Sequence, residues 1–214
     1  MKYLKLYEDH TMTEKDIHFM CKLFDIEDYS INSDMSIDVE GDVYLSGHDL
    51  KKIPLNFNYV SGNFQCYVNK LISLKGSPKE VGGSFICNDN FLTSLEYAPK
   101  KVGGDFNCNN NKITSLKGVP EIVKGAFNCS YNSIESLEGL QDEYLSFGCS
   151  NNKLTTLKGA PKIVRDNFSC SGNELISLEY LPEIGNTLFC SDNNILFLDD
   201  LPKELNGDLF CDNN

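Results

Sequence analysis

The hydrophobic pattern of the chain repeats every 20 or 21 residues from residue 43 onward. The unit Cys-x-x-Asn occurs eight times, and its cysteines are Cys66, Cys87, Cys108, Cys129, Cys149, Cys170, Cys190 and Cys211. Phe or Leu stands two residues before each cysteine, an aliphatic residue stands five places after it, and Leu stands eight places after it in every complete repeat. A degenerate copy runs from Val43 to Ile53. Registered positions on this scale predict a repeat protein.

The pair Phe-x-Cys has a period of two, which places both side chains on one face of a short strand. One strand per repeat predicts a parallel stack, in which Phe lies above Phe and Cys above Cys in a core that no single repeat buries alone. The asparagine turns the chain out of the strand. Its amide can satisfy backbone groups inside the coil, so we interpret these asparagines as structural.

The segment that returns to the next strand has only about ten residues, and most copies contain a proline, namely Pro78, Pro99, Pro120, Pro161, Pro182 and Pro202. Proline lacks a backbone donor and disfavours helix in the residue before it. The return path is therefore predicted to be extended or polyproline-like, with little helix.

The spacing apolar-x-Cys-x-x-Asn-x-Leu-x-x-Leu resembles the leucine-rich repeat family over residues 43–214, about four fifths of the chain. The short repeats resemble the class with extended convex sides found in secreted bacterial effectors. Wordings such as SLKGVP and VGGDFNCNNNKITSL resemble repeat proteins encoded by bacteriophages and large DNA viruses. The resemblance implies a solenoid with a parallel β stack and a mostly non-helical convex side. It brings no catalytic residues with it.

Residues 1–42 do not follow the repeat, and we expect them to form a small α/β cap on the open end of the stack. Residues 1–10 alternate like a strand. Thr13 and Asp16 make a weak capping box, and the apolar stripe of the helix that follows is Ile17, Met20, Cys21 and Phe24. A helix that binds a partner is the alternative reading of this stripe.

At the other end the chain stops at Asn214, on the last ladder asparagine and without a polar capping unit. The pattern leaves open a truncated stack and an edge covered by self-association or by a partner.

Composition indicates a reducing compartment and no membrane. The chain has no apolar run near 18 residues and no signal-like N-terminus, which favours a soluble protein. Eight of its nine cysteines occupy one core ladder, where in-register neighbours bridge poorly and the spacing does not resemble a zinc site. Buried, reduced thiols in the cytoplasm are therefore expected.

Solvent-facing positions beside the Phe and Cys slots contain seven Asp and no Lys or Arg, although the formal net charge of -12 is concentrated elsewhere, with -7 in residues 1–42. A crowded strand face may simply select Asn, Ser, Gly and Asp. The functional reading is an anionic concave surface with apolar anchors, and its candidate binding residues are Tyr44, Tyr67, Val68, Ile86, Asp89, Asp105, Tyr131, Phe189, Asp192 and Phe210.

Enzymatic chemistry finds no motif in a credible context, and the three histidines His10, His18 and His48 lie in the cap and the degenerate first coil. We therefore expect no enzyme activity, no cofactor and no metal. Direct binding to nucleic acid lacks the basic footprint that phosphates require.

The leading hypothesis is a protein-binding module, a phage-encoded factor that modulates a host protein, possibly a defence component, in the host cytoplasm. The alternatives are an acidic DNA mimic that inhibits a nucleic-acid enzyme, and a structural protein that assembles through its C-terminal edge.

Overall fold

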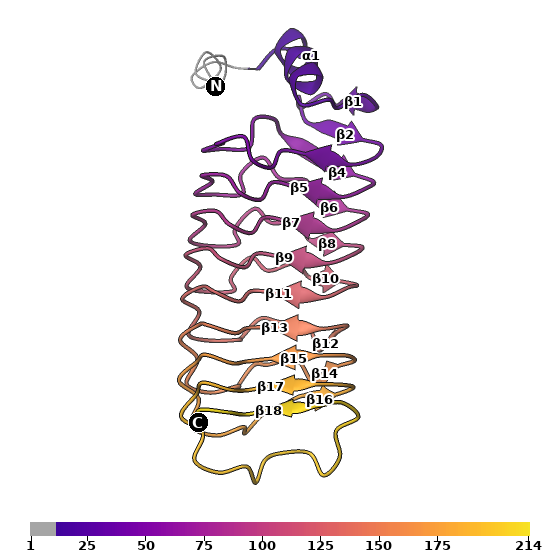
Figure 1. Cartoon of the computed structure of the whole chain (residues 1–214). Helices are drawn as coiled ribbons and strands as arrows, with labels where there is room; N and C mark the ends of the chain where they lie inside the picture. The colour runs from indigo at the N-terminus through magenta and orange to yellow at the C-terminus, as the bar shows by residue number, and fades with distance from the viewer. Residues whose placement is uncertain (1–11) are drawn as a thin grey trace.

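The computed structural model describes residues 12–214 and shows a solenoid of stacked coils with a short helix at its N-terminal end (Figure 1). Each coil contributes short strands that lie above the equivalent strands of the previous coil. The stack runs nearly straight, so its strand-bearing surface is flat along its length. The strand expected at residues 1–10 lies outside the described residues.

The first sheet carries the Phe-x-Cys motif, with one parallel strand per coil. Its strands in stack order are β3 (Val43–Tyr44), β5 (Phe64–Gln65), β7 (Phe85–Ile86), β9 (Phe106–Asn107), β11 (Phe127–Asn128), β13 (Phe147–Gly148), β15 (Phe168–Ser169), β17 (Leu188–Phe189) and β18 (Leu209–Phe210). Phe64 pairs with Phe85, and Phe85 pairs with Phe106. The register predicted from the repeat is confirmed.

The core is built from the repeated Phe, Cys and Leu positions. The rings of Phe64 and Phe85 stack with their centroids 5.4 Å apart and their planes inclined by only 5°. The ladder cysteines from Cys66 to Cys190 are completely buried, Cys211 is half-buried, and none of the described cysteines forms a disulfide. Each coil therefore covers the apolar face of its neighbour.

The ladder asparagines satisfy backbone groups of two coils at once. The Asn90 side-chain amide donates to the carbonyl oxygens of Cys66 at 3.0 Å and of Cys87 at 3.1 Å, and its Oδ1 accepts the backbone N–H of Leu71 at 3.0 Å. The pattern recurs along the stack, for example at Asn152, whose amide donates to Cys129 and Cys149. The structural interpretation of these asparagines is confirmed.

The return path is extended, as predicted, and it forms further parallel sheet that the repeat pattern did not predict. Its strands are β2 (Ile37–Val39), β4 (Phe57–Val60), β6 (Glu80–Val81), β8 (Lys101–Val102), β10 (Ile122–Val123), β12 (Glu143–Tyr144), β14 (Ile163–Val164) and β16 (Glu183–Ile184). The inward side chains, such as Val81 and Val102, pair in register and are buried against the core. The coils are thus flattened between two surfaces of strands.

This second layer is interrupted between β10 and β12. The Gln141 side chain takes the place of a strand there: its Oε1 accepts the N–H of Val123 at 2.9 Å and its amide donates to the Val123 carbonyl at 2.9 Å. β1, β2, β4, β6, β8 and β10 form one sheet, whereas β12, β14 and β16 form another. The interruption falls in the coil that has only 20 residues between Cys129 and Cys149 and no proline in its return segment.

The N-terminal cap contains helix α1 (Glu14–Leu23) and strand β1 (Tyr29–Ile31). The capping box is present: Thr13 Oγ1 accepts the Asp16 N–H at 3.3 Å, and Asp16 Oδ2 accepts the Thr13 N–H at 2.9 Å. The apolar stripe of α1 is buried in the core, which confirms the capping role. Strand β1 pairs antiparallel with β2, so the second layer begins before residue 43 and ends in an antiparallel strand.

The buried thiols should resist labelling in the native protein. Thiolate is the reactive form, and burial raises the pKa of Cys129 to about 12. We expect a thiol reagent to modify Cys211 first and the other cysteines only on unfolding, as measured by mass spectrometry of labelled peptides. Rapid labelling of Cys108 or Cys129 without denaturant would contradict the core ladder.

Truncating the ring of Phe106 should be far more costly than truncating its neighbour Asn107. Phe106 is completely buried between two other rings, so Phe106→Ala should lower the free energy of unfolding by about 3–5 kcal/mol. Asn107 is only half-buried and accepts the Asn109 N–H at 3.1 Å, so Asn107→Ala should lose about 1 kcal/mol. Urea denaturation measures both, and equal losses would show that the register is wrong.

Candidate binding surface

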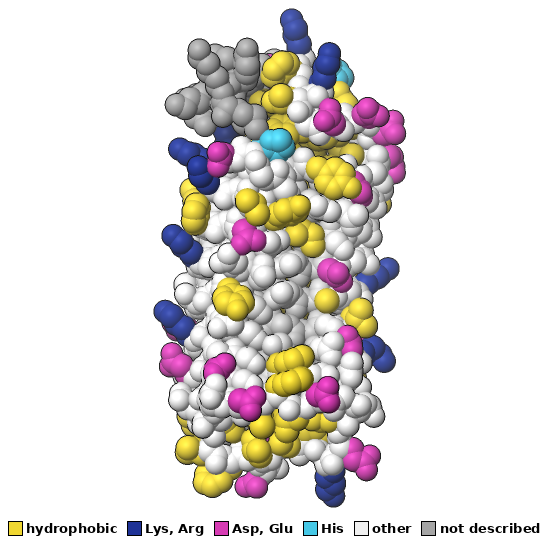
Figure 2. Space-filling view, viewed as in Figure 1, with side chains coloured by type: hydrophobic (Ala, Val, Ile, Leu, Met, Phe, Trp, Pro, Cys, Tyr) yellow, Lys and Arg dark blue, Asp and Glu magenta, His cyan; other side chains and the backbone are white. Residues whose placement is uncertain are grey.

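The outward face of the first sheet, which we call the strand face, consists of the residue between the Phe and Cys positions of each coil, the two residues before Phe and the two after Cys. Figure 2 shows this face. Hydrophobic side chains lie in separate groups on a mostly uncharged background, and Lys and Arg lie along the margins. The absence of basic residues from these positions is therefore a property of a continuous surface.

The structure places all ten candidate residues on the strand face. Tyr44, Val68, Tyr131 and Phe210 are 55%, 54%, 58% and 43% exposed. Asp105 and Asp192 are also exposed, and the half-buried ones are Tyr67, Ile86, Asp89 and Phe189.

The candidates fall into two apolar groups with Tyr131 between them. Tyr44, Tyr67, Val68 and Ile86 come from three successive coils, and Tyr44 and Ile86 are both rung neighbours of Gln65. At the other end Phe189 pairs with Phe210, and their rings stack with centroids 4.9 Å apart and planes inclined by 3°.

Two aspartates that precede the core position are used within the fold. Asp42 Oδ1 accepts the Asn63 N–H at 2.6 Å, and Asp105 Oδ1 accepts the Ala126 N–H at 2.8 Å, in each case from the next coil. Uncharged side chains at the same position make the same bond, as Ser84 Oγ does with the Asp105 N–H at 3.0 Å. This position selects a short acceptor, which accounts for Asp105 without a ligand.

The residue before each ladder asparagine has a left-handed backbone, a feature that the sequence reasoning missed. The φ angles are 72° at Gly47, 50° at Val68, 54° at Asp89, 49° at Asn110, 54° at Tyr131, 53° at Asn151, 66° at Gly172, 58° at Asp192 and 57° at Asn213. Seven of these nine residues are Gly, Asn or Asp, the types that tolerate this conformation best. The recurrence of these types beside the ladder asparagine was the available signal.

Asp89 and Asp192 are thereby explained by backbone geometry, and both also accept hydrogen bonds from the side chain one coil further on. Asn110 donates to Asp89 Oδ1, and Asn213 donates to Asp192 Oδ1 at 3.0 Å. The fold itself therefore accounts for these two aspartates and for Asp105.

Val68 and Tyr131 are the exceptions at this position. A left-handed backbone crowds the Cβ atom against the following carbonyl oxygen, and it is a clear outlier for a β-branched or bulky residue. Neither side chain is buried, so core packing offers no compensation. Backbone strain held at exposed apolar side chains points to a role outside the fold.

A second left-handed position was also missed, in the turn that precedes the return segment. Gly76, Gly118, Gly139 and Gly159 occupy it in four coils, whereas Tyr97 and Tyr180 occupy it in two. Both tyrosines are about half exposed. They add apolar surface outside the strand face.

Tyr44 is held in place beside a carboxylate. Its hydroxyl donates to Asp42 Oδ2 at 2.6 Å. The Asn63 N–H, followed by the Tyr44 hydroxyl, lowers the pKa of Asp42, and the same contact raises the pKa of Tyr44. The pair therefore presents an aromatic ring next to a negative charge at neutral pH.

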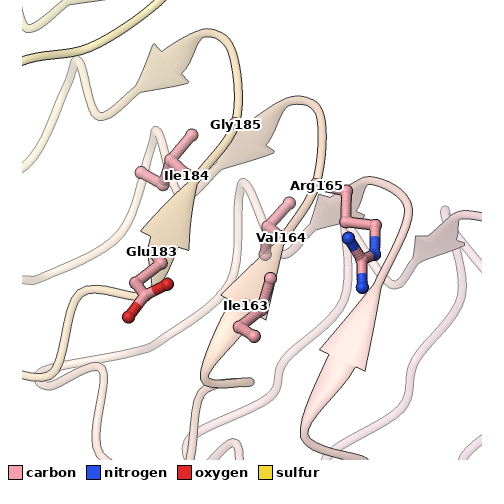
Figure 3. A pocket seen from close by; sticks show the side chains of 6 residues that line it. All are labelled: Ile163, Val164, Arg165, Glu183, Ile184 and Gly185. Atoms are coloured by element: carbon pink, nitrogen blue, oxygen red, sulfur yellow. The ribbon is translucent and has the colours of Figure 1, made fainter.

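The second layer has a shallow hollow of about 250 Å³ between β14 and β16 (Figure 3). Ile163, Val164, Ile184 and Gly185 line it, and Glu183 and Arg165 lie on opposite sides. Arg165 pairs with Glu143 on β12. The hollow brings together no nucleophile and base.

Residues 12–214 place no three His, Cys, Asp or Glu side chains for metal binding. The ten-residue α1 is too short for a bilayer span, and this part of the chain has no other helix to offer one. Comparison with known proteins finds neither a family whose model matches the chain nor a matching curated relative.

Relieving the strain at Val68 should stabilise the protein. Val68→Asn introduces the residue found at Asn110, Asn151 and Asn213 of the same ladder, and it should raise the free energy of unfolding by about 1 kcal/mol. The reverse change, Asn151→Val, should lower it by a similar amount. Urea denaturation measures both, and a loss of stability in Val68→Asn would show that valine is favoured there by the fold itself.

Proposed function

We propose that the chain is a protein-binding module that uses its strand face. The observation that carries the proposal is the retention of Val68 and Tyr131 at positions where the backbone favours Gly, Asn or Asp. Both side chains are exposed and apolar, and each adds strain to the folded state. A contact with another molecule is the simplest use for such side chains, because aromatic and aliphatic anchors dominate protein interfaces.

The finer proposal concerns the type of repeat and its biological setting. The spacing of the Phe, Cys, Asn and Leu positions supports a short leucine-rich repeat, with the asparagine ladder in the role that the spacing predicts. The resemblance to repeats encoded by bacteriophages and large DNA viruses supports a viral factor. Such a factor would act in the host cytoplasm by covering the surface of a host protein, with a defence component as one candidate.

The DNA-mimic hypothesis is less well supported. A mimic needs carboxylates that are free to replace phosphates in a basic cleft, whereas Asp42 and Asp105 accept backbone N–H groups and Asp89 and Asp192 accept side-chain amides. Self-assembly through the C-terminal edge stays a prediction. Size measurements over a range of protein concentrations test it directly.

Capture of a bacterial protein by the immobilised chain, followed by affinity measurement with the purified partner, tests the proposed function. The double variants Tyr67→Ser with Ile86→Ser and Phe189→Ser with Phe210→Ser each remove one apolar group of the strand face. At least one of them should weaken binding about tenfold or more, because anchors of this kind contribute about 1–2 kcal/mol each.

The matched control replaces two exposed apolar residues outside the strand face, Tyr97→Ser with Tyr180→Ser, and should leave the affinity unchanged. Circular dichroism and thermal melting verify that each variant is folded. Wild-type affinity in both strand-face variants would refute binding through this face.

A further inference from the structure

The N-terminal patch, which we define as Tyr44, Tyr67, Val68 and Ile86, differs from the other apolar group of the strand face in what leaves it free to bind. The rings of Phe189 and Phe210 stack on each other, so each covers a face of the other. Tyr44 makes its hydrogen bond at the edge of the ring, through the hydroxyl, and more than half of the side chain is exposed. The patch therefore offers apolar surface in a fixed orientation.

The charges beside the patch are negative. Asp42 holds the Tyr44 hydroxyl, and Asp89 follows Ile86 by three residues. The lysine nearest to Val68 in sequence is Lys70, and it pairs with Asp49 at 3.0 Å. None of the strand-face positions carries Lys or Arg, so nothing on the face balances Asp42 and Asp89.

This charge pattern discriminates between occupants. Nucleic acid is repelled because its phosphates need a basic surface. A second copy of the chain presents the same acidic face and a net charge of -12, so face-to-face pairing sets like charges against each other. A cationic side chain is attracted by the carboxylates and also by the faces of tyrosine rings.

We propose that the N-terminal patch binds a basic protein segment in which Lys or Arg side chains flank an apolar residue. The apolar residue packs against Val68 and Ile86, and the cationic groups lie beside the Tyr44 ring and the Asp42 and Asp89 carboxylates. This inference rests on the proposed function and assigns to it one half of the face and one class of partner.

Selection of random 12-residue peptides from a display library on the immobilised chain tests the proposal. The enriched peptides should carry Lys or Arg next to aliphatic or aromatic residues. A synthetic copy of an enriched peptide should bind about tenfold or more weakly to the variant Tyr44→Ser with Val68→Asn. Its affinity should also fall about tenfold between 50 and 500 mM NaCl, because salt screens exposed charges.

The matched control is Phe189→Ser with Phe210→Ser, which should change the affinity less than twofold. Enriched peptides that are acidic or uncharged overturn the proposal, as does an unchanged affinity in Tyr44→Ser with Val68→Asn. Peptides lost only with the phenylalanine pair would uphold binding by the strand face and refute the N-terminal patch. No enrichment, a dimer dispersed by the patch variant, or capture of an oligonucleotide also overturns it.

Discussion

The hydrogen bonds of the ladder asparagines are the constraint on which the structure depends. Each coil turns out of its strand inside the stack, where backbone groups have no water to bond. Asn90 satisfies carbonyl groups of Cys66 and Cys87 and the N–H of Leu71, and thereby joins its own coil to the previous one. An unpaired buried backbone group costs roughly 1–3 kcal/mol. A side chain of another shape at this position would leave several such groups unpaired.

The same turn determines which residues can precede the asparagine. Because the chain must enter it with a left-handed backbone, the neighbouring position favours Gly, Asn and Asp, and this preference places Asp89 and Asp192 on the surface. An acidic row on a repeat protein can thus arise from backbone geometry. Val68 and Tyr131 carry more functional information than the aspartates because they depart from that preference.

The core could be predicted from the sequence because its signal is repeated. Phe85, Cys87 and Leu92 recur with their equivalents at fixed spacing, and all are completely buried. The pairing of the return strands was missed, since a two-residue strand such as Glu80–Val81 has no periodicity of its own. The role of Gln141 was also missed, because a glutamine that replaces a strand leaves no pattern beyond a shortened repeat.

The candidate surface was located correctly as a register of positions, but its energetics depend on φ angles that residue types alone do not reveal. At Val68 the repeat predicted an outward side chain and could not predict backbone strain. The bonds of Asp105 to the next coil likewise depend on the distance between coils. Register follows from sequence, whereas strain and hydrogen-bond partners follow from three-dimensional geometry.

The Gln141 interruption has a consequence for cooperativity. In a solenoid each coil interacts mainly with its neighbours, so the folded stack behaves as a one-dimensional array of coupled units. Between β10 and β12 the coupling comes from the first sheet, the core and one glutamine side chain, whereas other neighbours also share strand pairing in the second layer. This junction is therefore the natural boundary between two units of unfolding, and the N-terminal patch and the Phe189–Phe210 pair belong to different units.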